Sequence, residues 1–284
     1  MFGTDPEVFI YSENLGVISP ALLEIENVIK PVIDDEKHPV FIDEKEFQWH
    51  MDGCAMELKI KKGLRSAKEI KSILDLSLES LENFVKNLNY KGEKLVVKKV
   101  PTIELVEELY LDKLNNKKVY QGFIFGCDPD RDALSNYKAK TRNIYVPYRF
   151  GGGHIHVSNK LFYQYTIPAV KLLMITVGNY VIKLTPYPEL EKMRSQFFSC
   201  GRYRPQKYGD GSFGIEYRSP SNTWISFSTD KIEEILYLIN KVDYLLKNPK
   251  IGVEIIKNFE DRSISAIQNA DVELASNILS ELSL

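Results

Sequence analysis

Paired polar residues recur in four short segments of this sequence, and their types could do chemistry. The pairs are Asp5 and Glu7 in GTDPEVF, Asp52 and Glu57 in DGCAMEL, His154 and His156 in GGGHIHV, and Glu216 and Arg218 in GIEYRS. In a β-strand, residues two apart point to the same face. If these segments are strands of one sheet, that sheet has a polar face lined with carboxylates, imidazoles and a guanidinium.

Such a face needs cations to compensate its carboxylates, because a buried ion without a partner costs several kcal/mol. Oxygen-rich sets with one imidazole suit Mg²⁺ or Mn²⁺ better than zinc, which prefers nitrogen and sulfur. Hard ions of this kind usually bind together with phosphate. Arg202, Arg204 and Arg218 would then bind phosphate oxygens in fork geometry, and the glycines of GGGHIHV would form a flexible segment whose backbone approaches a nucleotide.

Each motif alone also has a structural interpretation. A D-x-E pair is more often a solvated strand edge, since most acidic residues are exposed. The H-x-H pair is either a ligand pair or one functional and one packed histidine, GGG is most often a turn or hinge, and RYR is usually a surface pair around a tyrosine. The order of the motifs favours the chemical interpretation: two acidic pairs, the histidines, the arginines, then E-x-R.

Strands and helices that would position these motifs alternate along the chain. Strand composition occurs in EVFIYS from Glu7, CAMELKI from Cys54, KLVVKKV from Lys94, YQGFIFG from Tyr120, HIHVS from His154 and GIEYRS from Gly214. Several of these strands alternate polar and apolar residues, as in a sheet with one exposed face. The pattern predicts an α+β protein with a largely antiparallel sheet.

Four helices are predicted by apolar spacing and capping signals. Their positions are a helix after the Ser66/Glu69 capping box, an apolar helix from Pro168 to Lys183, a helix capped by Thr229 or Asp230, and a helical tail from Ser263 to Leu282. The segment from Asn89 to Asp132 is rich in Lys, Asn, Gly and Pro, which indicates loops.

Composition limits the class of protein. The chain has 284 residues, of which 44% are hydrophobic and 27% charged, as in an ordinary soluble globular protein. Its net charge of −2 provides no global basic field, so nucleic acid is not an expected partner. Three widely separated cysteines without a CxxC pair indicate reduced thiols in a cytosol.

Neither a membrane anchor nor a leader is predicted. The N-terminus MFGTDPEVFI lacks the charged and apolar regions of a signal peptide. The apolar stretch from Val170 to Leu184 contains Lys171 and Lys183, which makes its apolar run too short to span a bilayer. A cytoplasmic protein is therefore expected.

The motifs in this order resemble the glutamine synthetase and glutamate–cysteine ligase superfamily. The residues within each motif are similar to those of its phage-encoded branch, the COOH–NH2 ligases of type 2. The matching segments are GTDPEVF, DGCAMELKI, GCDPD, GGGHIHV, the arginines of GRYR and YGDGSFGIEYRSPSNTW. They extend from residue 3 to residue 224 and leave out the C-terminal helices.

The resemblance implies a fold and a set of cofactors. It implies a curved, largely antiparallel sheet that forms an active-site funnel, with helices packed on its outer face. Residues 1–284 would be a single catalytic domain, with a sheet core over 3–227 and C-terminal helices over 229–284. The funnel would hold ATP and two or three Mg²⁺ or Mn²⁺ ions, in the host cytoplasm if the protein is phage-encoded.

Residue roles follow from the resemblance, position by position. The implied metal ligands are Asp5, Glu7, Glu57, His154 and Glu216. Arg218 would neutralise the transferred phosphoryl group, and Arg202 and Arg204 would hold the nucleotide phosphates. His156 would bind phosphate or substrate, and Asp52 would stand at the second acidic position or act as a base.

This sequence departs from the family pattern at three points. Asp5 is shorter than the glutamate usual in glutamine synthetase. The N-terminal domain that completes a neighbour's active site in glutamine synthetase has no counterpart before GTDPEVF, so an active site shared between subunits is not implied. A homo-oligomer stays an open alternative. Asp128 and Asp130 of GCDPD take no role from the family.

The implied reaction is an ATP- and Mg-dependent ligation of a carboxylate and an amine. ATP phosphorylates the carboxylate, and the amine attacks the acyl phosphate to give an amide, with Asp52, Asp128 or Asp130 as the base. The substrates would be small molecules or peptides. The alternatives are a guanidino-kinase-like phosphotransferase of the same superfamily, and a catalytically inactive binding or structural protein that retains the fold.

Overall fold

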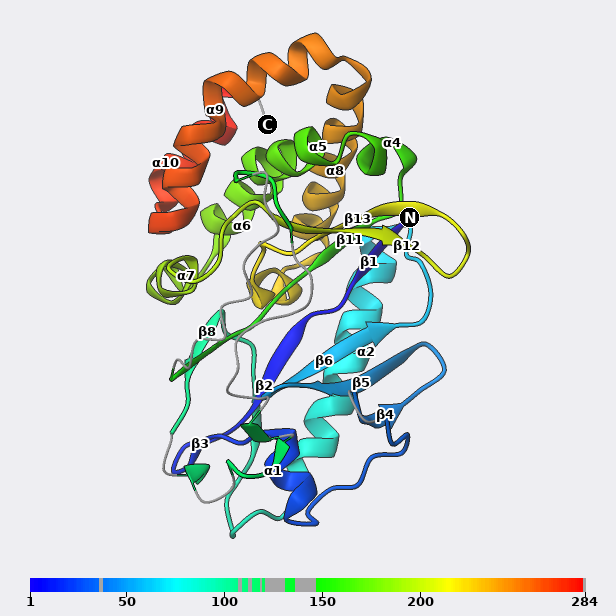
Figure 1. The fold of residues 1–284 in the computed structure, drawn as a ribbon, viewed down its shortest axis with the longest axis vertical. Helices are drawn as coiled ribbons and strands as arrows, with labels where there is room; N and C mark the ends of the chain where they lie inside the picture. Colours follow the sequence, from blue (N-terminus) through cyan, green and yellow to red (C-terminus); the bar gives the residue numbers. More distant parts are fainter. Residues whose placement is uncertain are drawn as a thin grey trace.

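The computed structural model describes residues 1–35, 38–106, 109–111, 114–117, 119–120, 131–135 and 147–282. Its strands pair antiparallel and its helices lie outside the sheets, so the predicted α+β class with antiparallel pairing is confirmed. Figure 1 shows the strands in the middle and lower parts of the molecule, with most helices above them.

The strands fall into two larger sheets and one small one. The first has the order β1 (Phe2–Thr4), β11 (Ile155–Val157), β13 (Phe213–Tyr217), β12 (Arg202–Lys207) and β9 (Arg131–Asp132). The second has the order β3 (Gly16–Val17), β2 (Glu7–Ser12), β6 (Ala55–Ile60), β5 (Phe47–Asp52) and β4 (Val40–Asp43), with β7 (Val96–Lys98) also paired to β2. The small sheet pairs β8 (Thr102–Glu104) with β10 (Tyr148–Phe150).

The chain passes from the first sheet to the second at Asp5 and Pro6. Strand β1 pairs with β11, whereas β2 pairs with β6 and β7. Pro6 has no N–H group, so it cannot donate to a continuous ladder at this point. The prediction that Asp5 and Glu7 share one face of a single strand is therefore wrong: they lie on either side of the change of sheet.

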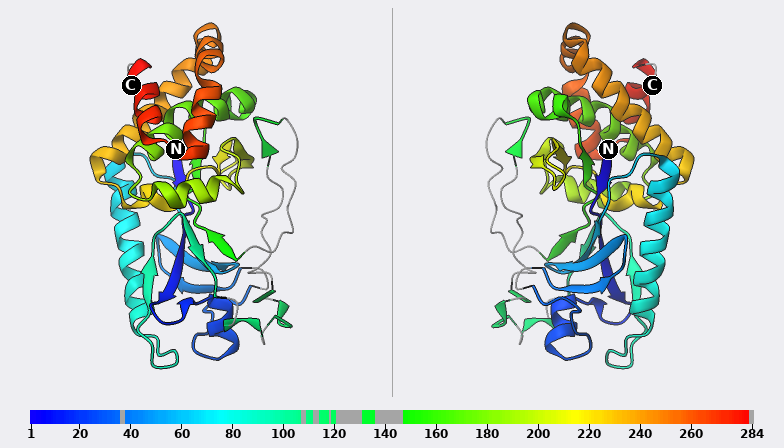
Figure 2. Two further views of the ribbon diagram at one scale, coloured as in Figure 1. Left: turned by 90° about the vertical axis from the view of Figure 1, so that its left-hand side faces the viewer. Right: turned by 90° about the vertical axis from the view of Figure 1, so that its right-hand side faces the viewer.

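Helix α2 (Ala67–Lys86) covers one face of the second sheet (Figure 2). Its buried residues Ile70, Leu74 and Leu81 belong to the core, and the indole Nε1 of Trp49 on β5 donates to the carbonyl of Ser77 at 2.9 Å. The predicted N-cap is confirmed, since Ser66 Oγ accepts from the Glu69 amide at 3.2 Å.

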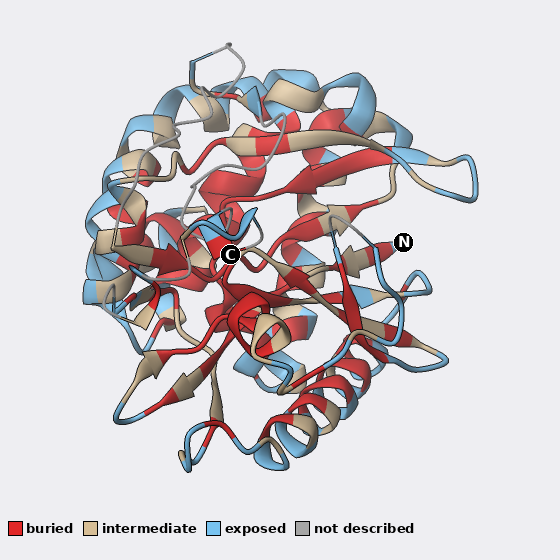
Figure 3. Ribbon diagram, turned by 60° about the horizontal axis from the view of Figure 1, so that its bottom comes forward, coloured by how far each residue is buried: buried red, intermediate tan, exposed pale blue. Residues whose placement is uncertain are grey.

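The remaining helices of the described residues lie in different parts of the molecule (Figure 1). They are α1 (Pro20–Ile25), α4 (Lys160–Gln164), α5 (Thr166–Leu173), the π-helix η3 (Met174–Gly178), α6 (Asn179–Leu184), α7 (Pro188–Ser195), the 3-10 helix η4 (Asn222–Ser226), α8 (Thr229–Lys247), α9 (Pro249–Asn269) and α10 (Val272–Glu281). Helices α4 and α5 contact β13 of the first sheet. Figure 3 shows buried residues concentrated along the strands and on the inward sides of the helices.

Two helix predictions need correction. The N-cap of α8 is Ser228 rather than Thr229 or Asp230. The predicted helical tail is two helices, because Ala270 adopts a left-handed conformation with φ 49° that ends α9, and Asp271 then caps α10. Of the predicted strand from Tyr120 to Gly126, Tyr120 is helical and the other residues lie outside the described residues.

The apolar helical stretch is present, with the π-helix in its middle. Among the described residues, Thr166–Leu184 is the one helix long and apolar enough to cross a membrane, so the expectation that it is too short is wrong by length and composition. However, 67% of its most apolar window is buried inside the protein, as is usual for a core helix.

We expect Ser66→Ala to lower the free energy of unfolding by about 1 kcal/mol, because the change removes the hydroxyl that accepts from the Glu69 amide. Urea unfolding followed by circular dichroism measures the change. Ser80→Ala, within the same helix, is the control and should be neutral or slightly stabilising. Equal destabilisation by the two substitutions would contradict the capping role.

Candidate metal centre

A cavity of about 1320 Å³ brings together the polar residues of both larger sheets. The predicted site residues that line it are Asp5, Glu7, Asp52, Glu57, His154, His156, Arg202, Arg204 and Arg218. Glu216 lies behind the cavity wall, fully buried, and contacts residues that line it. Asp128 and Asp130 lie outside the described residues.

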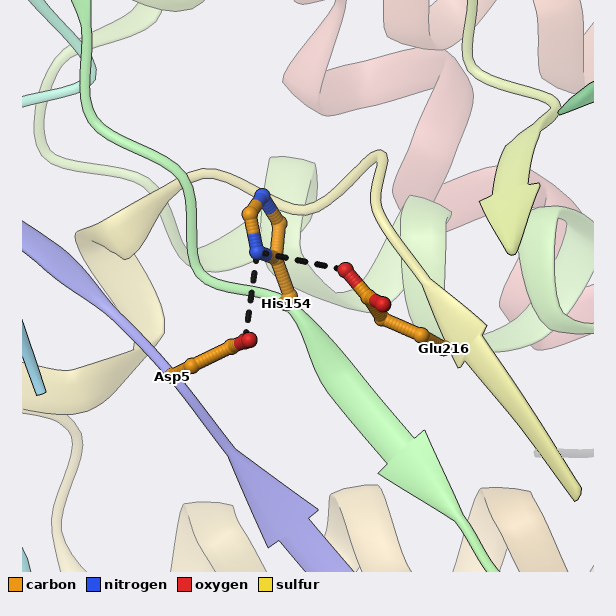
Figure 4. Close-up of side chains that lie close together, drawn as sticks. All are labelled: Asp5, His154 and Glu216. Atoms are coloured by element: carbon orange, nitrogen blue, oxygen red, sulfur yellow. Dashed lines mark ion pairs between the residues drawn. The ribbon is translucent and has the colours of Figure 1, made fainter. Parts of the chain in front are cut away.

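Asp5, His154 and Glu216 form the first group of potential metal ligands (Figure 4). His154 Nδ1 lies 3.2 Å from Asp5 Oδ1 and 3.7 Å from Glu216 Oε1. The hydroxyl of Thr4 donates to the carbonyl of His154 at 2.7 Å, which ties the backbone of the histidine to β1. The end of β1, the start of β11 and the middle of β13 therefore converge on one point.

Glu7, Glu57 and His154 form the second group. Glu7 and Glu57 are directly opposite each other in the β2–β6 ladder, so their side chains share the face that lines the cavity. Their ligand atoms and that of His154 all lie within 4.8 Å of one another. His154 thus belongs to both groups, and it joins the carboxylates of the two sheets.

His156 lies on the same side of its strand as His154, as predicted. Its Nε2 atom lies 3.1 Å from Asp5 Oδ2, and its register partner on β13 is Glu216. Burial opposes the charged imidazole, but Asp5 outweighs that effect and raises the pKa of His156. Asp5 is therefore held between two imidazoles, one on each carboxylate oxygen.

The carboxyl groups fall into two electrostatic classes. Burial acts to raise the pKa of Asp5 and of Glu216, but His156 and His154 hold the pKa of Asp5 well below its ordinary value, and Arg218 lowers that of Glu216. By contrast, burial and the neighbouring carboxylates, Asp52 first, raise the pKa of Glu57 well above its ordinary value. Burial also raises the pKa of Glu7.

A divalent cation fits this donor set. Among the described residues, Glu7 and Glu57 form no ion pair with a lysine or an arginine. Arg218 acts on both carboxyls from a distance and lowers their pKa values, but burial outweighs its effect. Asp5 Oδ1 and His154 Nδ1 are buried and make no hydrogen bond of normal geometry, although they lie close together. Carboxylate oxygens with one imidazole are ligands typical of Mg²⁺ and Mn²⁺ sites.

The triple glycine is packed rather than flexible, so the predicted flexible segment or hinge is wrong. All three glycines are buried. A Cβ atom on Gly153 would lie 2.1 Å from the Ser221 carbonyl oxygen, and one on Gly151 would lie 2.2 Å from Asn222 Nδ2. Gly152 donates its amide to Glu7 Oε2 at 2.8 Å, and a Cβ there would lie 2.5 Å from His154 Nε2.

The three predicted arginines have different partners in the structure. Arg218 donates to Glu216 Oε1, and Arg204 Nη1 lies 3.4 Å from Glu216 Oε2. Arg202 lies with its guanidinium 4.6 Å from the ring centre of Phe198. Arg204 and Arg218 are therefore placed beside the first group of ligands, and Arg202 beside the aromatic ring.

Further polar residues of the cavity were not predicted. They include His38, His50, Arg149, Arg194, Gln206 and Tyr208. His50 Nε2 lies 2.9 Å from Glu57 Oε2, and Gln206 donates to Glu216 Oε2 at 2.5 Å. Burial and His38 lower the pKa of His50 to about 4.

The alternation of residues along the strands could have predicted some of these cavity residues. Gln206 and Tyr208 continue the alternation that begins with Arg202 and Arg204, and His50 stands two residues before Asp52. Arg149 and Arg194 carry no such local signal, because they come from β10 and from helix α7.

No family model matches this chain, and neither a curated protein nor a solved structure matches it.

Metal-free protein should lose stability as the pH rises, in part through Glu57. A carboxyl whose pKa is raised by folding contributes stability that is complete below its ordinary value of 4.5 and lost as the pH rises through its folded-state value. In Glu57→Gln this contribution is absent, so the free energy of unfolding should decline less as the pH rises above about 4.5. Urea unfolding at a series of pH values, in the presence of a chelator, measures this decline. Glu79→Gln, at an exposed position, is the control. Identical pH profiles for Glu57→Gln and the parent protein would refute the assignment.

Gly153→Ala should destabilise the protein by about 2–3 kcal/mol, because the new methyl group would overlap a backbone oxygen that cannot rotate away. Gly209→Ala is the matched control, since a Cβ there meets nothing within 4 Å, and its effect should stay within about 0.5 kcal/mol. Thermal unfolding of the two variants checks the difference. A flexible triple glycine would instead tolerate both substitutions equally.

Proposed function

We propose that this protein is an ATP- and Mg²⁺-dependent ligase that joins a carboxylate to an amine. The observation that carries the proposal is the sharing of His154 by two carboxylate groups in one large cavity, beside Arg204 and Arg218. The motif order of the sequence, which resembles that of the carboxylate–amine ligases, supplies the reaction class.

The proposed division of labour follows the geometry. Asp5, His154 and Glu216 would hold one ion, and Glu7, Glu57 and His154 a second. Bound ions of this kind neutralise phosphate oxygens and orient a phosphoryl group for in-line transfer. The chain itself supplies the rigid placement of the ligands, because two of them, Glu216 and His154, are almost completely buried.

Arginines would stabilise the negative charge of the reacting groups. Arg218 and Arg204 contact Glu216 and line the cavity, so a phosphate that enters beside them meets guanidinium groups held in place by a buried carboxylate. Arg202 would hold a phosphate nearer to Phe198. Preorganised donors of this kind contribute strongly to catalysis because they need no rearrangement during the reaction.

Asp52 would act as the base that accepts a proton from the amine. It lines the cavity at the end of β5, next to the turn at Gly53, and no described lysine or arginine forms an ion pair with it. A general base has to lie within hydrogen-bond reach of the proton that it accepts, so its place in the cavity is what supports this role. His156 would contact phosphate or substrate beside it.

The fold is consistent with the proposed funnel of the glutamine synthetase superfamily. Residues of both larger sheets line the cavity. On β13, Ile215 and Tyr217 alternate with Glu216, and Tyr217 packs near Gly178 of η3, so helices lie on the side away from the site. We further propose one catalytic domain over residues 1–284, acting in the cytoplasm on small-molecule or peptide substrates.

The test is phosphate release from ATP by purified protein with Mg²⁺, across panels of carboxylates and amines. Release that requires both substrates, with an amide product in the mass spectrum, is the expected result. Glu57→Gln and Arg218→Ala should each abolish it, whereas the surface variant Asp43→Asn should not. Formation of ADP and a phosphorylated guanidino compound without an amide, or no phosphate release with any substrate pair, would overturn the ligase proposal.

The two histidines provide a sharper comparison in the same assay and in Mn²⁺ titrations. His154 belongs to both ligand groups, whereas His156 contacts only Asp5 among the proposed ligands. His154→Asn should weaken Mn²⁺ binding by at least about 100-fold, because loss of an outer partner alone costs about 10–100-fold. His156→Asn should cost less; a larger loss for His156→Asn would contradict the assigned roles.

A further inference from the structure

Two buried, oppositely charged residues of helix α7 hold the backbone that follows β13. Arg194 donates from Nη1 to the Ser219 carbonyl at 2.6 Å, and from Nη2 to the carbonyls of Arg218 and Pro220 at 3.5 Å each. Glu191, three residues earlier, has a side chain that is almost completely buried, like that of Arg194. Helix α7 therefore carries two oppositely charged side chains that are almost completely buried.

Glu191 continues the contacts along the same backbone segment. Its Oε1 atom accepts from the hydroxyl of Ser221 and from that of Thr223, the latter at 3.0 Å. Together the two side chains of α7 bind the chain from Arg218 to Thr223. Helix α7 is itself anchored, because Ser195 Oγ donates to the carbonyl of Ile267 on α9 at 3.1 Å.

Residues 218–224, called the 218–224 segment below, in turn hold the triple glycine in place. The Gly153 amide donates to the Pro220 carbonyl at 2.9 Å, the Asn222 amide to the Gly151 carbonyl at 3.0 Å, and Trp224 Nε1 to the Gly153 carbonyl at 2.8 Å. The adjacent residue is His154. The metal ligand shared by both groups is thus placed by contacts that lead back to α7.

The same segment also reaches the second sheet. Asn222 Nδ2 donates to the backbone carbonyl of Glu7 at 2.7 Å, and the Glu7 amide donates to the Gly152 carbonyl at 2.8 Å. One short segment therefore sets the relative position of Glu7, His154 and Arg218, which come from different strands.

We propose that Glu191 and Arg194 are positioning residues for the candidate metal centre, acting through the 218–224 segment on His154, Glu7 and Arg218. Neither residue is placed to ligate the ion. The predicted effect of these two residues on metal binding rests on the proposed function. Their contacts with the backbone do not, because those contacts exist whatever the cavity binds.

Arg194→Met separates positioning from electrostatics. Arg194 lines the cavity, so removal of its positive charge should strengthen cation binding if charge alone mattered. Positioning predicts the opposite sign: Mn²⁺ affinity, measured by electron paramagnetic resonance, should fall by about 10–100-fold. Arg194→Lys should recover part of the affinity, since one donor group remains, and Glu191→Leu should lower it, because leucine cannot accept from Ser221 and Thr223.

Hydrogen exchange gives a readout that does not depend on a metal. In Arg194→Met and Glu191→Leu, peptides that contain the Gly153 and Glu7 amides should exchange several-fold faster at temperatures where the circular dichroism remains native. Glu189→Gln and Lys192→Gln, at exposed positions of the same helix, are the controls and should exchange as the parent does.

The outcomes distinguish the two proposals. Unchanged exchange at Gly153 and Glu7 in folded Arg194→Met, or Mn²⁺ binding equal to or tighter than that of the parent, would overturn the positioning role even if the melting temperature falls. Faster exchange in a protein whose parent binds no Mn²⁺ would support the positioning role and reject the metal centre. Weakened Mn²⁺ binding without any ligase activity in the parent would reject only the ligase.

Discussion

Four carboxyl groups crowd around the imidazole of His154. Asp5, Glu7, Glu57 and Glu216 all lie close enough to this imidazole to share a cation with it. Like charges held together in a poorly solvated place raise one another's pKa, as at Glu57, unless a cation is near, as Arg218 is near Glu216. The fold therefore has to hold several mutually repelling groups in fixed positions.

Three features of the chain meet that constraint. Pro6 ends one ladder and lets Asp5 and Glu7 serve different sheets. The triple glycine brings the backbone before His154 against the 218–224 segment, where any side chain would collide. Helix α7 then ties that segment to the helical layer through α9. Together these features hold groups in positions that repulsion alone would disfavour.

Much of this arrangement could be predicted from short-range pattern. Alternation placed Glu216 beside Arg218 and His154 beside His156, and the structure confirms that each pair lies on one side of its strand. The helix at Ser66 followed from capping chemistry, which acts over a few residues.

The remainder depends on contacts between distant parts of the chain. Alternation alone could not reveal that Asp5 and Glu7 belong to different sheets, since that depends on which strands they pair with. The glycines looked flexible because their neighbours, Ser221 and Asn222, are about seventy residues away. Likewise the buried role of Arg194 has no local signature, because a charged helix residue is normally solvated.

Anomalous diffraction from crystals grown with Mn²⁺ and a non-hydrolysable ATP analogue tests the metal centre most directly. The hypothesis predicts Mn²⁺ peaks at the two ligand groups, one coordinated by Asp5, His154 and Glu216 and the other involving Glu7 and Glu57, with the analogue's phosphates on the cavity side of the ions. Crystals with the analogue bound elsewhere, or with no Mn²⁺ at either group, would contradict it.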